Sequence, residues 1–289
     1  MPDPAAFRLK APAKINLTLE ILGRRSDGYH EISSVMQTVS LADTLTFAPA
    51  DEEEIAVECD DPTLALSAQS NLVWRAARLV QQVRGVRQGA RVVLHKRIPL
   101  AAGLGGGSSD AAQTLLGLDR LWGLGLTGDE LQNLASLLGS DVPFFLRGGT
   151  VLVDGRGEQI TPLRPMSGGV FVLITPPFSV PDKTALVYSL LRPDETTDGT
   201  HTRLLADTLA AGRLPPATML YNGLEDAAFR AFGDLDRVRG QVIAAGADSV
   251  HVAGAGPSLY VYDPTGEDAP ALHAALLKAD LPAHLMYPV

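Results

Sequence analysis

Hydrophobic residues along the chain follow two different periods. Residues 14–21 carry Ile15, Leu17, Leu19 and Ile21 at every second position, a spacing that predicts a strand with one buried face. The polar stretch 23–31, which contains glycine, serine and aspartate, predicts a loop. Similar extended patterns predict strands through residues 35 and 39, around 45–47, over 55–59, 90–96, 150–154 and 170–174, and, interrupted by a glycine turn, over 249–262.

Other segments repeat their hydrophobic residues every three or four positions, as a helix with one buried stripe does. This pattern predicts helices over 71–83, 109–121 and 127–139, and helical patterns dominate 182–246. Serine and aspartate open the second helix, and Thr127 and Glu130 form a capping-box pattern at the third. Because strands and helices are interleaved without strict alternation, the sequence predicts an α+β fold. The turn-rich stretch 155–169 marks a domain boundary, which gives domains 1–164 and 165–289.

Composition narrows the choice of partners. The 289 residues include 24 lysines and arginines and 33 aspartates and glutamates, for a formal net charge of −9, which argues against nucleic-acid and anionic-membrane binding. No apolar run approaches the ~18 residues that span a bilayer, and the first residues lack a secretory pattern, so we expect a soluble cytoplasmic protein. Cys59 is the only cysteine, so an intrachain disulfide and a cysteine-based zinc site are not expected.

A small anionic ligand needs only a few local cations, for which the candidates are Lys14, Arg24, Arg25, Lys96, Arg97 and Lys183.

Segment 99–112 concentrates glycine immediately before a predicted helix. A glycine loop that runs into a helix N-terminus directs backbone N–H groups and the positive end of the helix dipole to one spot, where phosphate can bind. A tight turn with a serine cap would explain only one or two glycines, so we favour the phosphate site. A Walker loop is excluded because no lysine follows the glycines, and the dinucleotide pattern fails at Ser108. The segment contains Gly103, Gly105, Gly106 and Gly107, followed by Ser108 and Ser109.

Residues 99–109 resemble the phosphate-binding motif of the GHMP kinases, named for galactokinase, homoserine, mevalonate and phosphomevalonate kinases. Segments 11–43, 139–158 and 253–262 also resemble one branch of this family, in the expected order and over nearly the whole chain. The departures are Ala101 and Ala102, where the motif often has glycine, Ser140, where alanine is usual, and Ala253 and Ala255, where serine or threonine is usual around the glycines.

The resemblance implies a two-domain α+β fold with the active site in the cleft between domains. It also implies an enzyme that transfers the γ-phosphate of ATP, carried with Mg²⁺, to the 2-hydroxyl of a cytidine-diphosphate-bearing methylerythritol in the non-mevalonate isoprenoid pathway. The partner is then a small molecule, and the oligomeric state stays open. No acidic pair marks a dedicated metal cage, so the metal ligands stay open as well.

The same resemblance implies roles for individual residues. Asp141 would be the general base, and Lys14 would stabilise the charge that develops during phosphoryl transfer. Tyr29 and Tyr188 would form the aromatic walls of a cytosine site. The expected ATP-binding residues are Asn71, Leu72, Lys96, Gly103, Leu104, Gly105, Gly106, Gly107, Ser108 and Ser109. The expected substrate-binding residues are Asn16, Tyr29, His30, Asp141 and Tyr188.

Each residue also has a purely structural interpretation. Asp141 and Asn71 could cap helices, and Leu72 and Tyr188 could be core residues. Tyr29 could pack on the domain from its loop, and Lys96 could be a lysine at a strand end. The others could be exposed strand or loop residues: Lys14, Asn16 and His30. Two rival functions also remain. One is a GHMP kinase for another alcohol, such as homoserine or mevalonate, and the other is a nucleotide-binding relative that has lost catalysis.

Overall fold

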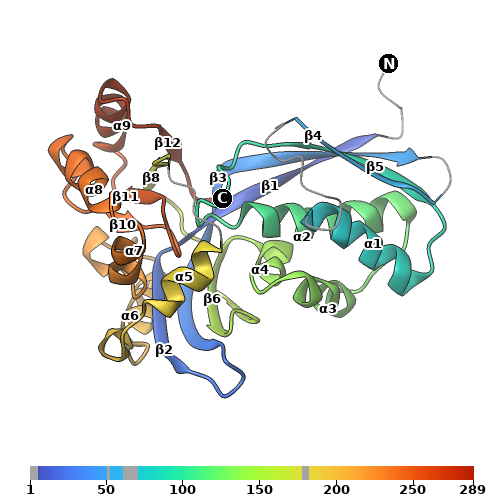
Figure 1. Ribbon diagram of the computed structural model, residues 1–289, viewed down its shortest axis with the longest axis horizontal. Coiled ribbons are helices and arrows are strands. Elements are labelled where there is room, and N and C mark those ends of the chain that lie inside the picture. Colours follow the sequence, from blue (N-terminus) through green and yellow to red (C-terminus); the bar gives the residue numbers. More distant parts are fainter. Residues whose placement is uncertain (1–5, 51–52, 61–70, 178–181) are drawn as a thin grey trace. The chain divides into compact units, whose positions relative to one another are not determined.

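The protein contains two compact units, each assembled from separate stretches of the chain. The computed structural model describes residues 6–50, 53–60, 71–177 and 182–289 (Figure 1). The first unit comprises Met1–Ala13, Leu41–Ile98 and Gly105–Gly148, and the second comprises Lys14–Ser40, Pro99–Leu104 and Gly149–Val289. The predicted domains 1–164 and 165–289 do not coincide with these units. Two of the five points at which the chain changes unit lie within long strands, β1 (Phe7–Asn16) and β3 (His30–Ala50), where no turn signal marks a boundary.

The first unit packs helices against one face of a sheet (Figure 1). Residues 44–50 of β3 pair antiparallel with β5 (Gly89–His95), which in turn pairs parallel with β4 (Ile55–Cys59). A Cβ on Gly117 of the second helix would overlap the buried ring of Phe47 on β3, so glycine is what allows this helix to lie so close to the strand. The helices are α1 (Leu72–Arg84), α2 (Gly106–Trp122), α3 (Gly128–Leu138) and α4 (Val142–Arg147).

The second unit contains two groups of strands. The first part of β3 pairs antiparallel with β2 (Thr18–Arg24) and with β6 (Thr150–Gly155). β6 also pairs antiparallel with β7 (Gln159–Pro162), and β2 pairs parallel with β9 (Tyr221–Asn222). The other group is an antiparallel sheet in the order β10-β11-β8-β12. Its strands are β8 (Val170–Ile174), β10 (His251–Val252), β11 (Leu259–Asp263) and β12 (Ala283–Met286).

One hydrophobic core joins the four-stranded sheet of the second unit to its helices. It includes Val172 and Ile174 of β8, Leu259 of β11 and Leu276 of the last helix. The helices of this unit are α5 (Lys183–Ser189), α6 (Thr200–Ala210), α7 (Glu225–Ala231), α8 (Leu235–Ala244) and α9 (Ala269–Lys278), with short 3₁₀ turns at Pro193–Glu195 and Ala217–Met219. In the part of the chain that the structure describes, no helix is both long and apolar enough to cross a membrane.

The α+β prediction is confirmed, with two corrections to its elements. The predicted strand 14–21 is interrupted at Leu17, because β1 ends at Asn16 and β2 begins at Thr18. Its polar face, predicted to be exposed, is buried as well. The buried Glu20 carboxylate accepts a hydrogen bond of 2.7 Å from the Thr202 N–H, and Thr18 Oγ1 accepts one of 2.9 Å from the Val35 N–H. Partners supplied by distant segments therefore make burial of these polar residues possible.

Candidate functional site

The glycine segment enters α2 through a residue in the left-handed region. Gly105 occupies the N-cap position with φ +70°, and no side chain caps the helix. The predicted serine cap is therefore wrong: α2 begins at Gly106, and Ser108 and Ser109 lie in its first turn. Ser109 Oγ is buried and has no hydrogen-bond partner among the described residues. This leaves a buried hydroxyl close to the helix N-terminus that could bond to a ligand.

Three glycines in this segment have a local structural reason. A Cβ on Gly103, which has φ +83°, would overlap the carbonyl oxygen of Ala253. A Cβ on Gly106 would lie 3.0 Å from Cγ2 of Ile98, and Gly105 needs its positive φ. Contacts within the protein thus account for three of the four glycines, so the number of glycines alone does not indicate a ligand. Ala101, one of the departures from the motif, has φ +51°, so an alanine holds a conformation that glycine adopts more easily.

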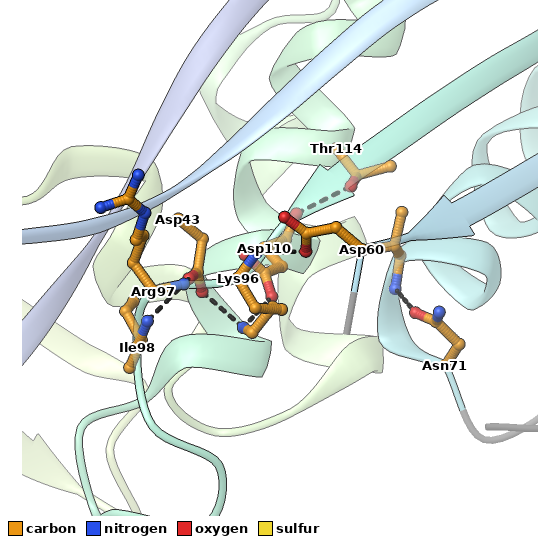
Figure 2. Close-up of polar contacts among 9 residues, drawn as sticks. Asp43, Asp60, Asn71, Lys96, Arg97, Ile98, Asp110 and Thr114 are labelled. Atoms are coloured by element: carbon orange, nitrogen blue, oxygen red, sulfur yellow. Dashed lines mark hydrogen bonds and ion pairs between the residues drawn. The ribbon is translucent and has the colours of Figure 1, made fainter. Parts of the chain in front are cut away.

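Lys96 lies between two carboxylates at the beginning of α2, as Figure 2 shows. Its Nζ donates a hydrogen bond to Oδ2 of Asp43 and another, of 2.8 Å, to Oδ2 of Asp110. A Cβ on Gly106 would lie 3.5 Å from the same Nζ, which places the ammonium against the glycine segment. The other oxygen of Asp43 accepts hydrogen bonds from the backbone N–H groups of Arg97 (2.5 Å) and Ile98 (2.8 Å). Lys96 does follow the end of β5, as the structural alternative has it, but its side chain is largely buried between two carboxylates.

The charges of this lysine and its two carboxylates are not balanced. Burial raises the pKa of the Asp110 carboxyl to about 7, the charge of Lys96 opposes that rise, and the charge of Asp43 adds to it. The pKa of the Lys96 ammonium is raised, since the two carboxylates together outweigh the effect of its burial. At neutral pH the lysine is therefore firmly protonated, whereas Asp110 carries a proton for part of the time.

Asn71 and Leu72 lie at the start of α1, next to the same glycine segment. Asn71 is the N-cap of α1, and its Oδ1 accepts a hydrogen bond of 2.9 Å from the Val73 N–H. The predicted capping role of Asn71 is therefore confirmed. A Cβ on Gly107 would lie 3.5 Å from Cδ1 of Leu72, so the side chain of Leu72 packs against the first turn of α2. The first unit thus brings Leu72, Lys96 and the start of α2 together.

Lys14 and Asn16, at the end of β1, are buried, with 5% and 6% of their surface exposed. Lys14 Nζ donates a hydrogen bond of 2.5 Å to Asn16 Oδ1, and Asn16 Nδ2 donates one of 2.8 Å to Oγ of Ser34. The Lys14 N–H bonds to the carbonyl of Leu104 at 3.0 Å. A Cβ on Gly254 would lie 3.4 Å from Lys14 Nζ. The interpretation of Lys14 and Asn16 as exposed strand residues is therefore wrong. Within the second unit, Lys14 lies beside Leu104 and Gly254.

Asp141 occupies the N-cap position of α4, but its side chain forms no capping hydrogen bond. Its backbone has φ −85° and ψ −12°, whereas capping residues normally have extended backbone from which the side chain turns toward the helix. Pro143 lies in the first turn, as expected. The alternative in which Asp141 serves as a helix cap is therefore not supported, and its carboxylate is available for other chemistry.

The three aromatic candidates of the second unit occupy different environments. Tyr29 is 56% exposed, and the guanidinium of Arg156 lies over its ring, 4.9 Å from the centroid. The rings of His30 and Tyr188 contact each other, with centroids 4.9 Å apart. Tyr188 is only half-buried, packed against the hydrophobic core. The pKa of His30 is lowered by partial burial and by the positive charge of Arg24, so its imidazole is neutral at pH 7.

Two residues with clear electrostatic roles were missed by sequence reasoning, and a third was underrated. Asp43 sits within an extended hydrophobic stretch, where a lone carboxylate is a signal of a buried partner. Asp110 was treated only as part of the helix start, although it lies on the buried side of α2. Lys183 was named only as one of several cations. Among the described residues, no three histidine, cysteine, aspartate or glutamate side chains cluster as a metal site would require.

The chain is similar to known kinases along most of its length. Residues 71–149 match the family model described as the GHMP kinases N terminal domain. The chain is 43% identical over 253 residues to the 4-diphosphocytidyl-2-C-methyl-D-erythritol kinase of Dehalococcoides mccartyi, covering 87% of each protein. It is 44% identical over 262 residues to the kinase of the same name from Symbiobacterium thermophilum, covering 88% of this chain and 89% of the relative.

Solved structures agree with these sequence matches. A crystal structure of 4-(cytidine 5'-diphospho)-2C-methyl-D-erythritol kinase is 37% identical and aligns with a TM-score of 0.80 over 98% of this chain and 100% of that chain. A homoserine kinase from Cytophaga hutchinsonii aligns with a TM-score of 0.73 over 100% of this chain and 96% of that chain, at 19% identity. At that identity the second likeness shows a shared fold and nothing about the substrate.

Proposed function

The chain belongs to the 4-diphosphocytidyl-2-C-methyl-D-erythritol kinase family of GHMP kinases, and we propose that it phosphorylates the 2-hydroxyl of that cytidine-diphosphate alcohol with ATP, in the non-mevalonate isoprenoid pathway. The observation that carries the proposal is the identity of 43% over 87% of the chain to a kinase of that name. We expect the reaction to take place in the cytoplasm.

We propose Asp141 as the general base and Lys14 as the electrostatic stabiliser. The Asp141 carboxylate makes no capping bond to α4, so it can accept a proton from the attacking hydroxyl or orient that hydroxyl. Lys14 is buried, and its Nζ is held by Asn16, so the ammonium has a fixed direction. A preorganised cation stabilises charge on a phosphoryl oxygen better than a mobile one, because no reorganisation is needed during the reaction.

We propose that ATP binds along the glycine segment and the residues beside it. The N-terminus of α2 offers unpaired backbone N–H groups, and the buried hydroxyl of Ser109 could donate a further hydrogen bond. Leu72 and Lys96 lie against the first turn of the same helix, where they could contact the nucleoside and its phosphates. Mg²⁺ would arrive with the nucleotide and keep most of its bonds to phosphate oxygens and water, since the described residues include no acidic cage for it.

We propose that the cytosine is recognised by the aromatic residues of the second unit. A neutral His30 imidazole presents one hydrogen-bond donor and one acceptor, which suits the edge of a base. Its ring contact with Tyr188 fixes an aromatic surface on which a base can stack. Tyr29 immediately precedes His30, the first residue of β3, and has Arg156 on one face of its ring.

Release of ADP in the presence of alternative alcohols tests the proposed reaction. We expect turnover with the cytidine-diphosphate alcohol, and turnover that is much slower or absent with homoserine and mevalonate. Comparable or faster turnover with homoserine or mevalonate would contradict the proposed substrate, and binding of ATP without turnover of any alcohol would favour a relative that has lost catalysis.

Asp141→Asn tests the proposed base. The amide cannot accept the proton, so we expect turnover to fall by at least the ~10²-fold typical of losing a general base. We expect little change in melting temperature, because Asp141 makes no capping bond that the amide could lose. Near-normal turnover at saturating concentrations of both substrates would remove Asp141 from the chemistry.

A further inference from the structure

Lys183, the first residue of α5, directs its ammonium group to a buried glycine-rich loop of the second unit. Its Nζ donates a hydrogen bond to the carbonyl oxygen of Gly256. That bond is the only polar contact of the Lys183 side chain among the residues that the structure describes. This partly buried ammonium therefore has a neutral partner where a carboxylate would normally be found.

A second lysine reaches the same loop two residues earlier. A Cβ on Gly254 would lie 3.4 Å from Lys14 Nζ, and Gly254 has φ +57°. The loop itself is held from another side by Asn222, whose Nδ2 donates hydrogen bonds of 2.8 Å to the carbonyls of Val252 and Gly254. Within the loop, the Gly256 N–H also bonds to the Ala253 carbonyl at 2.9 Å, so the backbone beside both ammonium groups is held by hydrogen bonds.

The charges around Lys183 do not compensate its own. α7 packs against α5 and carries Glu225, Asp226 and Arg230, but the charged group that acts on Lys183 is Lys14, which has the same sign. Glu225 is engaged elsewhere, with its carboxylate 3.5 Å from the Val252 N–H. Burial, and then the positive charge of Lys14, lower the pKa of Lys183 to about 8. An anion bound beside Lys183 would offset both effects on its ammonium.

We propose that Lys183 binds a phosphate group of the reactants, as a second cation of the phosphoryl-transfer site beside Lys14. The inference rests on the proposed function and extends it to a residue that lies outside the motifs of the sequence. A lysine ammonium is a compact point charge with three donors, so it can bond to phosphate while it keeps the Gly256 carbonyl. The phosphate could belong to ATP or to the diphosphate of the cytidine substrate.

Kinetics of three variants test the proposal. Lys183→Met removes the charge and keeps the length of the side chain, Lys183→Arg restores the charge, and Lys278→Met removes an exposed lysine from α9 as a control. Losing a charge-assisted hydrogen bond should lower kcat/KM by about 10- to 100-fold in Lys183→Met. Lys183→Arg should recover most of that loss, and Lys278→Met should resemble the wild type. The proposal is overturned if Lys183→Met stays within about twofold of the wild type.

Varying each substrate separately identifies the source of the phosphate. A loss confined to kcat/KM for ATP assigns Lys183 to the nucleotide, and a loss confined to kcat/KM for the cytidine substrate assigns it to the substrate diphosphate. Binding of inorganic pyrophosphate, measured by calorimetry, tests the anion site without turnover: weaker binding by Lys183→Met supports the proposal, and equal binding overturns it. This measurement separates the inference from the proposed function, which fails if the wild type does not phosphorylate the cytidine substrate.

The pH profile separates phosphate binding from support of the loop. Below pH 8 Lys183 is protonated, so the wild-type kcat/KM should fall as the pH rises through about 8. This alkaline limb should be absent from Lys183→Met and should move to higher pH in Lys183→Arg. If Lys183→Met is slower but keeps the wild-type limb, Lys183 only holds the Gly256 carbonyl and the proposal is wrong.

Discussion

Lys96 in the first unit is largely buried and Lys183 in the second is partly buried, and the surroundings shift the pKa values of the two ammonium groups in opposite directions. Lys96 donates to two carboxylates, and its pKa is raised. Lys183 donates to a backbone carbonyl, and its pKa is lowered to about 8 by burial and by a second lysine. Lys96 thus has two carboxylate partners within its own unit. Lys183 has no carboxylate partner among its described contacts.

The difference suggests two uses for a buried lysine beside a glycine segment. The contacts of Lys96 tie β3, β5 and α2 together, because Asp43 also binds the backbone of Arg97 and Ile98. Its removal leaves two carboxylates buried. The removal of Lys183 leaves only a carbonyl oxygen without a partner. Stability should therefore depend strongly on Lys96 and weakly on Lys183.

The largest expected effect is that of Lys96→Met. Removing one partner of a buried ion pair typically costs about 3–5 kcal/mol, because an uncompensated charge stays behind. We expect the free energy of unfolding in urea at pH 7.5 to fall by roughly that amount, with Lys278→Met as an exposed control. If the two variants unfold at the same urea concentration, Asp43 and Asp110 do not depend on Lys96 and the contrast between the two lysines fails.

A smaller effect is expected from alanine at the two ends of the glycine segment. A Cβ on Gly103 would overlap the Ala253 carbonyl at φ +83°, so Gly103→Ala should cost about 1–3 kcal/mol of stability, as overpacking does. A Cβ on Gly107 would make an ordinary contact of 3.5 Å with Leu72, so Gly107→Ala should be neutral or slightly stabilising in a helix. Thermal melts of the pair give the comparison, and equal losses would contradict the distinct packing of the two glycines.

Asp110→Asn should change the pH dependence of stability. The folded-state pKa of Asp110 is raised to about 7 from an ordinary 3.8, so the folded state binds more protons than the unfolded state between these values. Wild-type stability should therefore fall, relative to the variant, as the pH rises from 4 to 7. We expect the variant to be more stable by about 1–2 kcal/mol at pH 8. Urea unfolding at pH 5 and pH 8 checks this, and a difference that does not change with pH would contradict the raised pKa.

Elements governed by local chemistry could be predicted from the sequence. The helix predicted over 71–83 is observed as Leu72–Arg84 with Asn71 as its cap, and the capping box of Thr127 and Glu130 is present. Both depend on residues within one or two turns of each other. The start of α2 was misplaced by three residues, because Gly105 begins the helix through its positive φ and serine was expected to do so through its side chain.

Features that depend on distant partners could not be predicted. Glu20 is buried because the Thr202 N–H, 182 residues away, bonds to its carboxylate, and the alternating pattern of 14–21 contains no sign of this. The site shows the same limit. Lys14 and Lys96 were named, but the sequence does not show that one is held by Asn16 and the other by Asp43 and Asp110. Lys183 was not singled out because its importance depends on the loop that it contacts.

The smallest expected effect is that of Lys183→Met on stability. At pH 7 the variant loses a hydrogen bond to Gly256 but no longer buries a charge, so its free energy of unfolding should lie within ~1 kcal/mol of the wild type. The folded-state pKa of about 8 lies below the ordinary 10.5 of lysine. Between these values the unfolded wild type binds more protons than the folded one, so its stability should rise with pH relative to Lys183→Met. Urea unfolding of both proteins at pH 7, 8.5 and 10 measures the difference. A wild-type advantage that shrinks as the pH rises would mean that Lys183 is paired with an anion inside the fold, as Lys96 is, and the contrast between the two lysines would disappear.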